Sequence, residues 1–186
     1  ALVNTTVQIN LNNTSGQPLE TDVTMFLYEA GTKNLKYRFT HTLNRFGLPD
    51  TLVMDPKFKY DLVVNTLPRV EKSNITIKRN IHNTIELDAP QGYINVRFLN
   101  ASRMYPIQSR IMQVNSEKTI NVQDINYTDK YIVGKYKLEI LTLPRIYRTV
   151  EVTQSSTVNV NIDAPGRLSY KLSNHISGQI FIKNED

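Results

Sequence analysis

The chain has no cysteine, no tryptophan and only three histidines among its 186 residues. Without cysteine it can form neither a disulfide nor a thiolate metal site, although this absence leaves a cytoplasmic location open. No apolar run approaches the roughly 20 residues that a membrane-spanning helix requires. A basic segment followed by an apolar stretch, the pattern of a secretory signal, does not open the chain. We therefore expect no disulfide framework and no insertion into a membrane.

Signatures of several large enzyme classes are also missing. The chain contains no G-x-S-x-G nucleophile elbow, no P-loop, no G-x-G-x-x-G and no H-E-x-x-H. His41 and His82 fall far apart in the first copy of the repeat described below and His175 falls in the third, so a histidine metal site or a catalytic triad is not expected. Asp124 and Asp129 flank a loop that has too few acidic residues for calcium. We expect no enzyme activity, no metal and no cofactor.

The charge pattern argues against nucleic acid as a partner. The chain has 22 lysines and arginines, 17 aspartates and glutamates, and a net charge of +5. The cations are scattered singly between acids, whereas proteins that bind nucleic acid usually gather them on one face. We interpret them as the solvated faces of strands.

What the sequence does contain is a repeat. Residues 60–70 and 136–146 share the order Tyr-x-Leu followed by Thr-Leu-Pro-Arg, and Asp-Ala-Pro recurs at residues 88–90 and 163–165. The offset is 76 residues at the tyrosines (136 − 60) and 75 at the prolines (165 − 90). This period is the size of a small domain and too long for a solenoid unit. The sequence therefore predicts two similar domains, residues 1–90 and 91–165.

A third copy begins after the second Asp-Ala-Pro. Residues 166–186 contain the alternating segment Leu168 to Asn174 and a second segment from Gly178 to Lys183. Two strands cannot form an independent sandwich. Either the sequence stops inside a longer array, which we favour, or this hairpin packs on the second domain. Its apolar face predicts weak self-association through residues 166–186, because open strand edges pair with other surfaces.

Alternation with a period of two dominates both domains and predicts an all-β fold. Residues 157–163 alternate apolar and polar side chains without a fault, and only residues 122–127 suggest a helical turn. About seven short strands in each domain are typical of a two-sheet sandwich, Ig-like or transthyretin-like. The alternation also predicts matching core residues, namely Tyr60, Leu62 and Val64 in the first domain and Tyr136, Leu138 and Ile140 in the second. Strands are expected near residues 6–12, 22–29, 35–42, 51–54, 59–66, 73–78 and 82–88, and near residues 93–100, 107–114, 118–122, 130–133, 136–142, 147–152 and 157–163.

The repeated arginines are candidate ligand contacts. Arg69 and Arg145 follow a proline at the same place in each domain. They either contact a ligand at intervals of one domain, or cap a loop or pair with the aspartate of the nearby Asp-Ala-Pro, Asp88 or Asp163. Repetition of a stabilising motif is expected in any duplicated domain, so the structural alternative is favoured.

Ten tyrosines form a mild compositional bias, and residues 127–137 are the richest aromatic and basic stretch. Tyr127 and Tyr131 are candidate ligand contacts in this stretch, because tyrosine supplies area and a hydrogen bond with little loss of rotamer entropy. Tyrosine also fills and borders the cores of sandwiches, and this structural role is the favoured alternative.

Two features of the first domain resemble the carboxypeptidase-regulatory or transthyretin-like sandwiches. An alternating strand is followed by the turn Ser-Gly-Gln-Pro-Leu at residues 15–19 and then by the strand at residues 23–28. The Pro-Gly-x-Tyr turn of that family is present in degraded form at residues 55–60 and 132–136.

More narrowly, residues 131–147 and 82–92 resemble repeats that follow a von Willebrand A domain in cell-envelope proteins of Bacteroidota. The likeness covers most of residues 7–183. It implies an accessory region outside the cytoplasm, and it transfers no catalytic residue and no metal site, because the von Willebrand A domain itself is absent from this chain.

The resulting expectation is a non-catalytic structural or interaction module, a stalk or accessory array of sandwiches in a bacterial cell-surface or periplasmic protein. The alternative is a module that binds a glycan or a protein through inter-domain or loop-tip surfaces. The expected partners are other domains of the same parent protein, or a surface protein or glycan.

Overall fold

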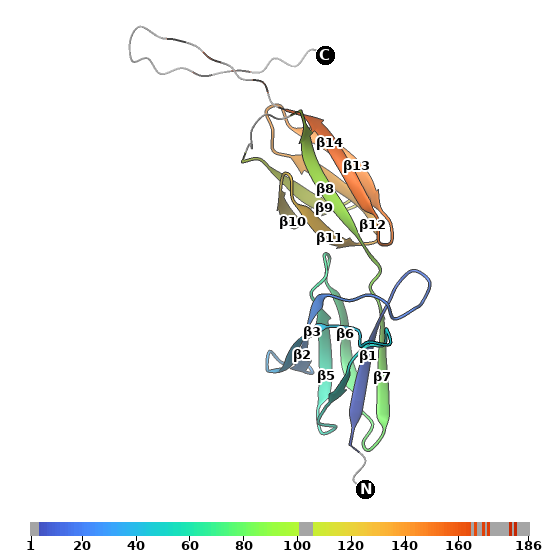
Figure 1. The fold of residues 1–186 in the computed structure, drawn as a ribbon. Helices are drawn as coiled ribbons and strands as arrows, with labels where there is room; N and C mark the ends of the chain where they lie inside the picture. Colours follow the sequence, from blue (N-terminus) through green and yellow to red (C-terminus); the bar gives the residue numbers. More distant parts are fainter. Residues whose placement is uncertain are drawn as a thin grey trace.

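The computed structural model describes residues 4–100 and 106–164, together with the single residues 166, 169, 171, 179 and 181. These residues form fourteen strands, β1–β14, and contain no helix (Figure 1). In particular, the described part of the chain has no helix that could cross a membrane. The expected all-β fold of tandem sandwiches is confirmed. The predicted third copy at residues 166–186 lies outside the described residues, apart from isolated positions.

The first sandwich consists of a three-stranded sheet, in the order β4-β1-β7, and a four-stranded sheet, in the order β3-β2-β5-β6. Strand β1 pairs in parallel with β7 and antiparallel with β4, and all neighbours in the second sheet are antiparallel. Its strands are β1 (Thr6–Asn12), β2 (Val23–Glu29), β3 (Leu35–His41), β4 (Thr51–Val53), β5 (Lys59–Val64), β6 (Val70–Thr76) and β7 (His82–Asp88).

The second sandwich repeats this topology, with sheets in the orders β11-β8-β14 and β10-β9-β12-β13. Each strand of the second sandwich therefore corresponds to the strand of the first whose number is lower by seven. The parallel pair β8/β14, for example, corresponds to β1/β7. The two sandwiches lie end to end, and β8 leaves the first sandwich directly into the second (Figure 1). The strands are β8 (Gln91–Leu99), β9 (Gln108–Gln113), β10 (Thr119–Asp124), β11 (Thr128–Ile132), β12 (Gly134–Ile140), β13 (Ile146–Val152) and β14 (Thr157–Asp163).

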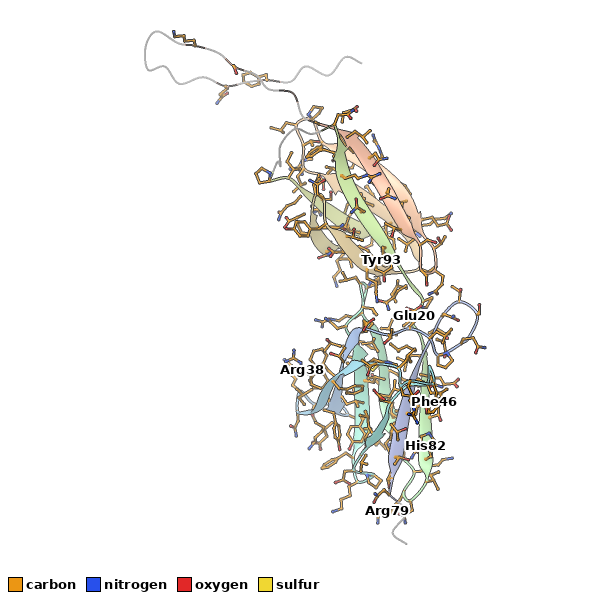
Figure 2. The ribbon with its side chains drawn as sticks, viewed as in Figure 1. Glu20, Arg38, Phe46, Arg79, His82 and Tyr93 are labelled. Carbon is orange, nitrogen blue, oxygen red and sulfur yellow. The ribbon has the colours of Figure 1, made fainter. Side chains whose placement is uncertain are left out.

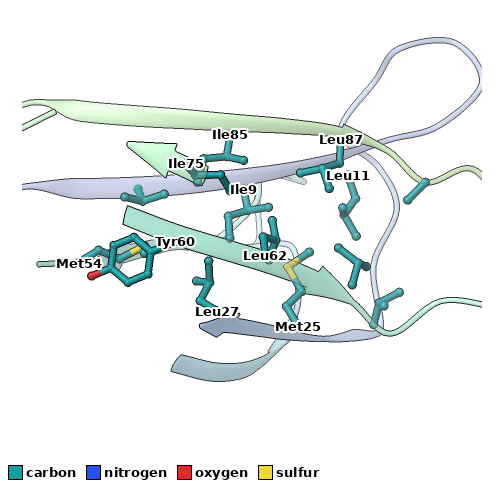
Figure 3. Close-up of a cluster of buried hydrophobic side chains, with 14 of the residues drawn as sticks. Ile9, Leu11, Met25, Leu27, Met54, Tyr60, Leu62, Ile75, Ile85 and Leu87 are labelled. Carbon is teal, nitrogen blue, oxygen red and sulfur yellow. The ribbon is translucent and has the colours of Figure 1, made fainter. Parts of the chain in front are cut away.

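Each sandwich buries its own core between its two sheets, as the alternation predicts. In the first, side chains from both sheets meet around Tyr60 and Leu62 (Figure 3). All six predicted core residues are buried: Tyr60, Leu62, Val64, Tyr136, Leu138 and Ile140. Because one face of each sheet is buried, a shift of one residue would expose the whole set, so this agreement fixes the strand phase.

The two core tyrosines use their hydroxyl groups in the same way. Tyr60 donates a hydrogen bond to the carbonyl oxygen of Asp55 at 2.7 Å, and Tyr136 donates one to that of Ile132 at 2.6 Å. A buried phenol needs such a partner. Burial also raises the pKa of Tyr136 to about 12, so both the packing and the hydrogen bond persist across the neutral range.

The suggested helical turn at residues 122–127 is wrong. Residues 119–124 form β10, which pairs with β9, and the chain then turns at Asn126, whose φ is 72°. The polar residues in this segment resemble a helix start, but Gln123 is buried in the sheet and its amide donates to the carbonyl of Ile94 at 2.9 Å. Pairing with β9 outweighs the local preference.

Candidate functional site at the junction of the two sandwiches

Both residues that link the two sandwiches are held by hydrogen bonds. Strand β7 ends at Asp88 and β8 begins at Gln91, which leaves only Ala89 and Pro90 between them. Ala89 is fully buried in the first core, and its N–H donates to the carbonyl of Asn12 at 3.0 Å. The carbonyl of Pro90 accepts a hydrogen bond at 2.8 Å from Val133 of the second sandwich. Both linking residues are thus held by one of the two domains.

Glu20 is the polar centre of the junction. It lies in the loop between β1 and β2, at the end of the first sandwich (Figure 2), and is only 7% exposed. One carboxylate oxygen accepts a hydrogen bond from the amide of Gln91 at 3.2 Å, and the other accepts one from the amide of Gln154. A buried carboxylate is costly unless it is hydrogen-bonded, and here both oxygens have partners from the second sandwich.

Two further hydrogen bonds extend this contact. The backbone N–H of Thr14 donates to the side-chain oxygen of Gln154 at 3.2 Å, and Lys130 donates to the carbonyl of Thr21 at 3.2 Å. Thus Gln154 contacts the β1–β2 loop of the first sandwich with both its amide nitrogen and its oxygen. These polar contacts fix the position of that loop against the second sandwich.

The apolar centre of the junction is the repeated Thr-Leu-Pro-Arg turn. In the first sandwich Leu67 packs against the core of the second, and its carbonyl accepts a hydrogen bond from the N–H of Ile132 at 2.7 Å. Ile132 in return packs against the core of the first sandwich. The turn is held from within, because the hydroxyl of Thr66 donates to the carbonyl of Pro68 at 2.7 Å. The Leu67–Pro68 peptide is cis. The turn therefore presents Leu67 in a defined position.

A groove lies beside this contact, between the two sandwiches. It has a volume of about 620 Å³. The β5–β6 turn supplies the exposed cation Arg69 with Thr66 and Pro68, and the second sandwich supplies Lys118 and Gln113. Cations, hydroxyls, amides and the carboxylate of Glu71 thus line a groove that also has apolar walls, a combination suited to a polar ligand.

The two repeated arginines differ in their ion pairs. Arg69 lies in the groove and has no ion pair among the described residues. Arg145 forms an ion pair at 3.1 Å with Glu139, which is also paired with Arg110 at 2.5 Å. Arg145 thus has a structural partner, but this partner is Glu139 on β12 and not Asp163. Both arginines are exposed, so they differ in that Arg145 is held by an ion pair and Arg69, in the part of the chain that the structure describes, is not.

The two candidate tyrosines also differ. Tyr127 is 59% exposed in the turn between β10 and β11, remote from the groove. Tyr131 is fully buried, and its hydroxyl donates to the side-chain oxygen of Gln123 at 2.9 Å and accepts from Asn121 at 2.9 Å. Tyr131 therefore belongs to the core and offers no surface to a ligand.

The two histidines among the described residues, His41 and His82, each have a separate partner. His41 is buried, its Nε2 lies 2.8 Å from the carbonyl of Ile9, and burial lowers its pKa. The Nδ1 of His82 lies 3.0 Å from the hydroxyl of Thr6 at the start of β1, and His175 lies outside the described residues. Within the described part of the chain, no three acidic or histidine side chains are grouped as a metal site would require.

The acids suggested for calcium are engaged elsewhere. Asp124 accepts a hydrogen bond from Gln108 at 2.8 Å, and Asp129 accepts one from Asn121 at 3.0 Å. Each carboxylate thus has a side-chain partner of its own.

Comparison with known proteins gives little guidance. No protein-family model matches the chain, and no curated protein is significantly similar to it. Among solved structures, the Bacillus anthracis TIE protein is 9% identical with a TM-score of 0.37, and the match covers 85% of this chain and 33% of that one. A point mutant of the major pilin from Streptococcus pyogenes is 8% identical with a TM-score of 0.23, over 86% of this chain and 99% of that one. At these TM-scores the likenesses carry no argument about function, and the chain spans only a third of the first protein.

Proposed function

We propose that this chain is a non-catalytic connector, a pair of sandwiches that serves as a stalk or accessory region and holds neighbouring parts of a protein in a fixed relation. The junction is the observation that supports this proposal. Its linker has no free residue, a buried carboxylate accepts hydrogen bonds across it, and Leu67 and Ile132 each pack against the core of the opposite sandwich. A flexible tether would have none of these contacts. The placement of the connector at a bacterial cell surface or in the periplasm follows only from the resemblance of the sequence repeats.

The absence of cysteine makes the connector easy to test. Two introduced cysteines, Thr76→Cys on β6 and Val122→Cys on β10, place one spin label on each sandwich at exposed sites. We expect pulsed electron paramagnetic resonance to give one narrow distance distribution between the labels. A distribution as broad as that of two domains on a free linker would contradict the proposal.

Removing the central carboxylate is expected to loosen the junction. In the Glu20→Ala variant, the amides of Gln91 and Gln154 lose their shared acceptor while the core of each sandwich stays intact. We expect a loss of stability of about 1–3 kcal/mol, as for unpaired buried donors, and a wider distance distribution between the same labels. Glu86→Ala, which removes an exposed acid from β7, is the control and should change neither quantity.

The groove supports a second candidate function, the binding of a glycan. The cations Arg69 and Lys118 stand on opposite sandwiches, and hydroxyl and amide groups lie between them. We expect a glycan array to give hits with the unmodified chain, and the double variant Arg69→Ser, Lys118→Ser to bind those glycans at least about tenfold more weakly. Lys59→Ser, an exposed cation outside the groove, is the matched control. An array without hits, or hits that the double variant retains, would remove this candidate and leave the connector unaffected.

A further inference from the structure

The turn that joins the two sandwiches is repeated at the free end of the second. Leu143 occupies the place of Leu67, the Leu143–Pro144 peptide is also cis, and the hydroxyl of Thr142 donates to the carbonyl of Pro144 at 2.7 Å. Leu67 is covered by the second core, but Leu143 is 87% exposed. The second sandwich thus presents the same projecting leucine, on the same preformed turn, with nothing covering it among the described residues.

The surface that receives such a leucine, called the seat below, also has a counterpart at the free end of the first sandwich. In the second sandwich the seat lies at Ile132, whose carbonyl accepts the hydrogen bond of Tyr136. The residue with this role in the first sandwich is Asp55, which accepts from Tyr60. A shallow cavity of about 460 Å³, widely open to solvent, lies there. Its lining includes Val53, which is 65% exposed, together with Tyr37, Met54, Asp55, Pro56 and Arg79.

The strand pairing places this cavity at the position in the first sandwich that corresponds to the occupied seat of the second. Val53 pairs with Thr6 at the start of β1, as Lys130 pairs with Tyr93 near the start of β8. The turn before the last strand matches too, since Asn80 and Ser155 both have positive φ, 59° and 55°. Arg79 therefore corresponds to Gln154, the residue that donates to Glu20 across the junction.

Arg79 lies at the end of the molecule remote from the second sandwich, whereas Glu20 lies at the junction (Figure 2). The free end of the first sandwich thus carries a hydrogen-bond donor where the occupied seat has one. This end also differs from the occupied one. Asp55 stands in the place of Ile132, and Val53 in the place of Lys130. The N–H of Asp55 donates to the hydroxyl of Tyr37 at 3.3 Å, near the long limit for a hydrogen bond, whereas that of Ile132 donates to Leu67.

We infer that copies of this chain associate head to tail, with Leu143 of one copy seated in the cavity around Val53 and Arg79 of the next. The occupant is a second copy, because this chain repeats the leucine turn at one free end and, at the other, the place in the fold where that turn is received. The two surfaces are different, so the contact is heterologous and forms an open series rather than a closed dimer. This inference goes beyond the connector role and does not depend on it.

The interface is small, and the affinity is expected to be weak. We expect sedimentation analysis from about 1 μM to about 1 mM to show a mass that rises with concentration and passes beyond that of a dimer. Leu143→Asp and Val53→Asp should each weaken association at least about tenfold, because each places a charge in an apolar contact. Val122→Asp, at an exposed valine in mid-strand on β10, is the matched control and should associate like the unmodified chain.

A mixture of the two variants tests whether the chains associate through this contact or through another one. The Leu143→Asp chain keeps an intact seat and the Val53→Asp chain keeps an intact leucine, so the equimolar mixture should form 1:1 dimers that cannot grow. A chain that stays monomeric throughout the concentration range would overturn the inference. So would association that both variants retain, because the contact would then lie elsewhere, for instance in residues 166–186.

Discussion

Replacing Gly92 by alanine is expected to destabilise the second sandwich by about 3 kcal/mol or more, at the upper end of the range for overpacking. A Cβ atom at this position would lie 2.1 Å from the carbonyl oxygen of Thr153 and 2.8 Å from Cγ1 of Val152. The nearer atom belongs to the backbone and cannot move aside as the end of a side chain could. Either β8 or the turn at residues 153–156 must shift.

That turn also carries Gln154, so the substitution is expected to disturb the junction together with the second sandwich. Chemical denaturation followed by NMR signals from each sandwich measures the loss. Gly16→Ala is the comparison: no atom lies within 4 Å of its Cβ, and its φ of 73° predicts a smaller cost, about 1–2 kcal/mol. If Gly92→Ala cost no more than Gly16→Ala, the close approach of β8 to this turn would be refuted.

Replacing Leu138 by alanine is expected to lower the free energy of unfolding of the second sandwich by about 2–5 kcal/mol, the range for leucines removed from packed cores. Leu138 is fully buried, and it lies in β12 between two neighbouring strands that prevent the site from collapsing. Because the chain has two domains, one unfolding curve does not define one free energy. Signals resolved for each sandwich are therefore required, and those of the first should change little.

Leu62→Ala is the matched variant, since Leu62 has the same place in β5 and is equally buried. It should destabilise the first sandwich by a similar amount. Val122→Ala, at an exposed position, is the control and should cost less than about 0.5 kcal/mol. A loss of that size for Leu138→Ala would mean that Leu138 does not lie in the core.

The fold was predictable because its signal is local. In β14, Val160 and Ile162 face the core while Asn159 and Asn161 face solvent, so the burial of each residue follows from its place in an alternating segment. The repeat then placed two such domains in series. The error at residues 122–127 arose where polar side chains enter the sheet, since Gln123 is buried for its hydrogen bonds rather than for its hydrophobicity.

The junction was not predictable in the same way, because its contacts join residues far apart in the sequence. Glu20 and Gln154 are separated by 134 residues, and nothing near Glu20 indicates that its carboxylate is buried. Leu67 and Leu143 occupy the same motif and differ only in what covers them. Tyr131 was a candidate ligand contact beside the favoured core role, and its burial in β11, which pairs with β8, agrees with the core role.

The central claim is that the two sandwiches keep one relative orientation, and residual dipolar couplings test it most directly. Couplings from backbone amides of residues 6–88, and of residues 91–100 and 106–163, are measured in one weakly aligned sample and fitted separately to the structure. A fixed junction predicts that both sets give the same alignment tensor, in magnitude and in orientation. Two tensors of clearly different magnitude would show that the sandwiches reorient independently, and would contradict the account.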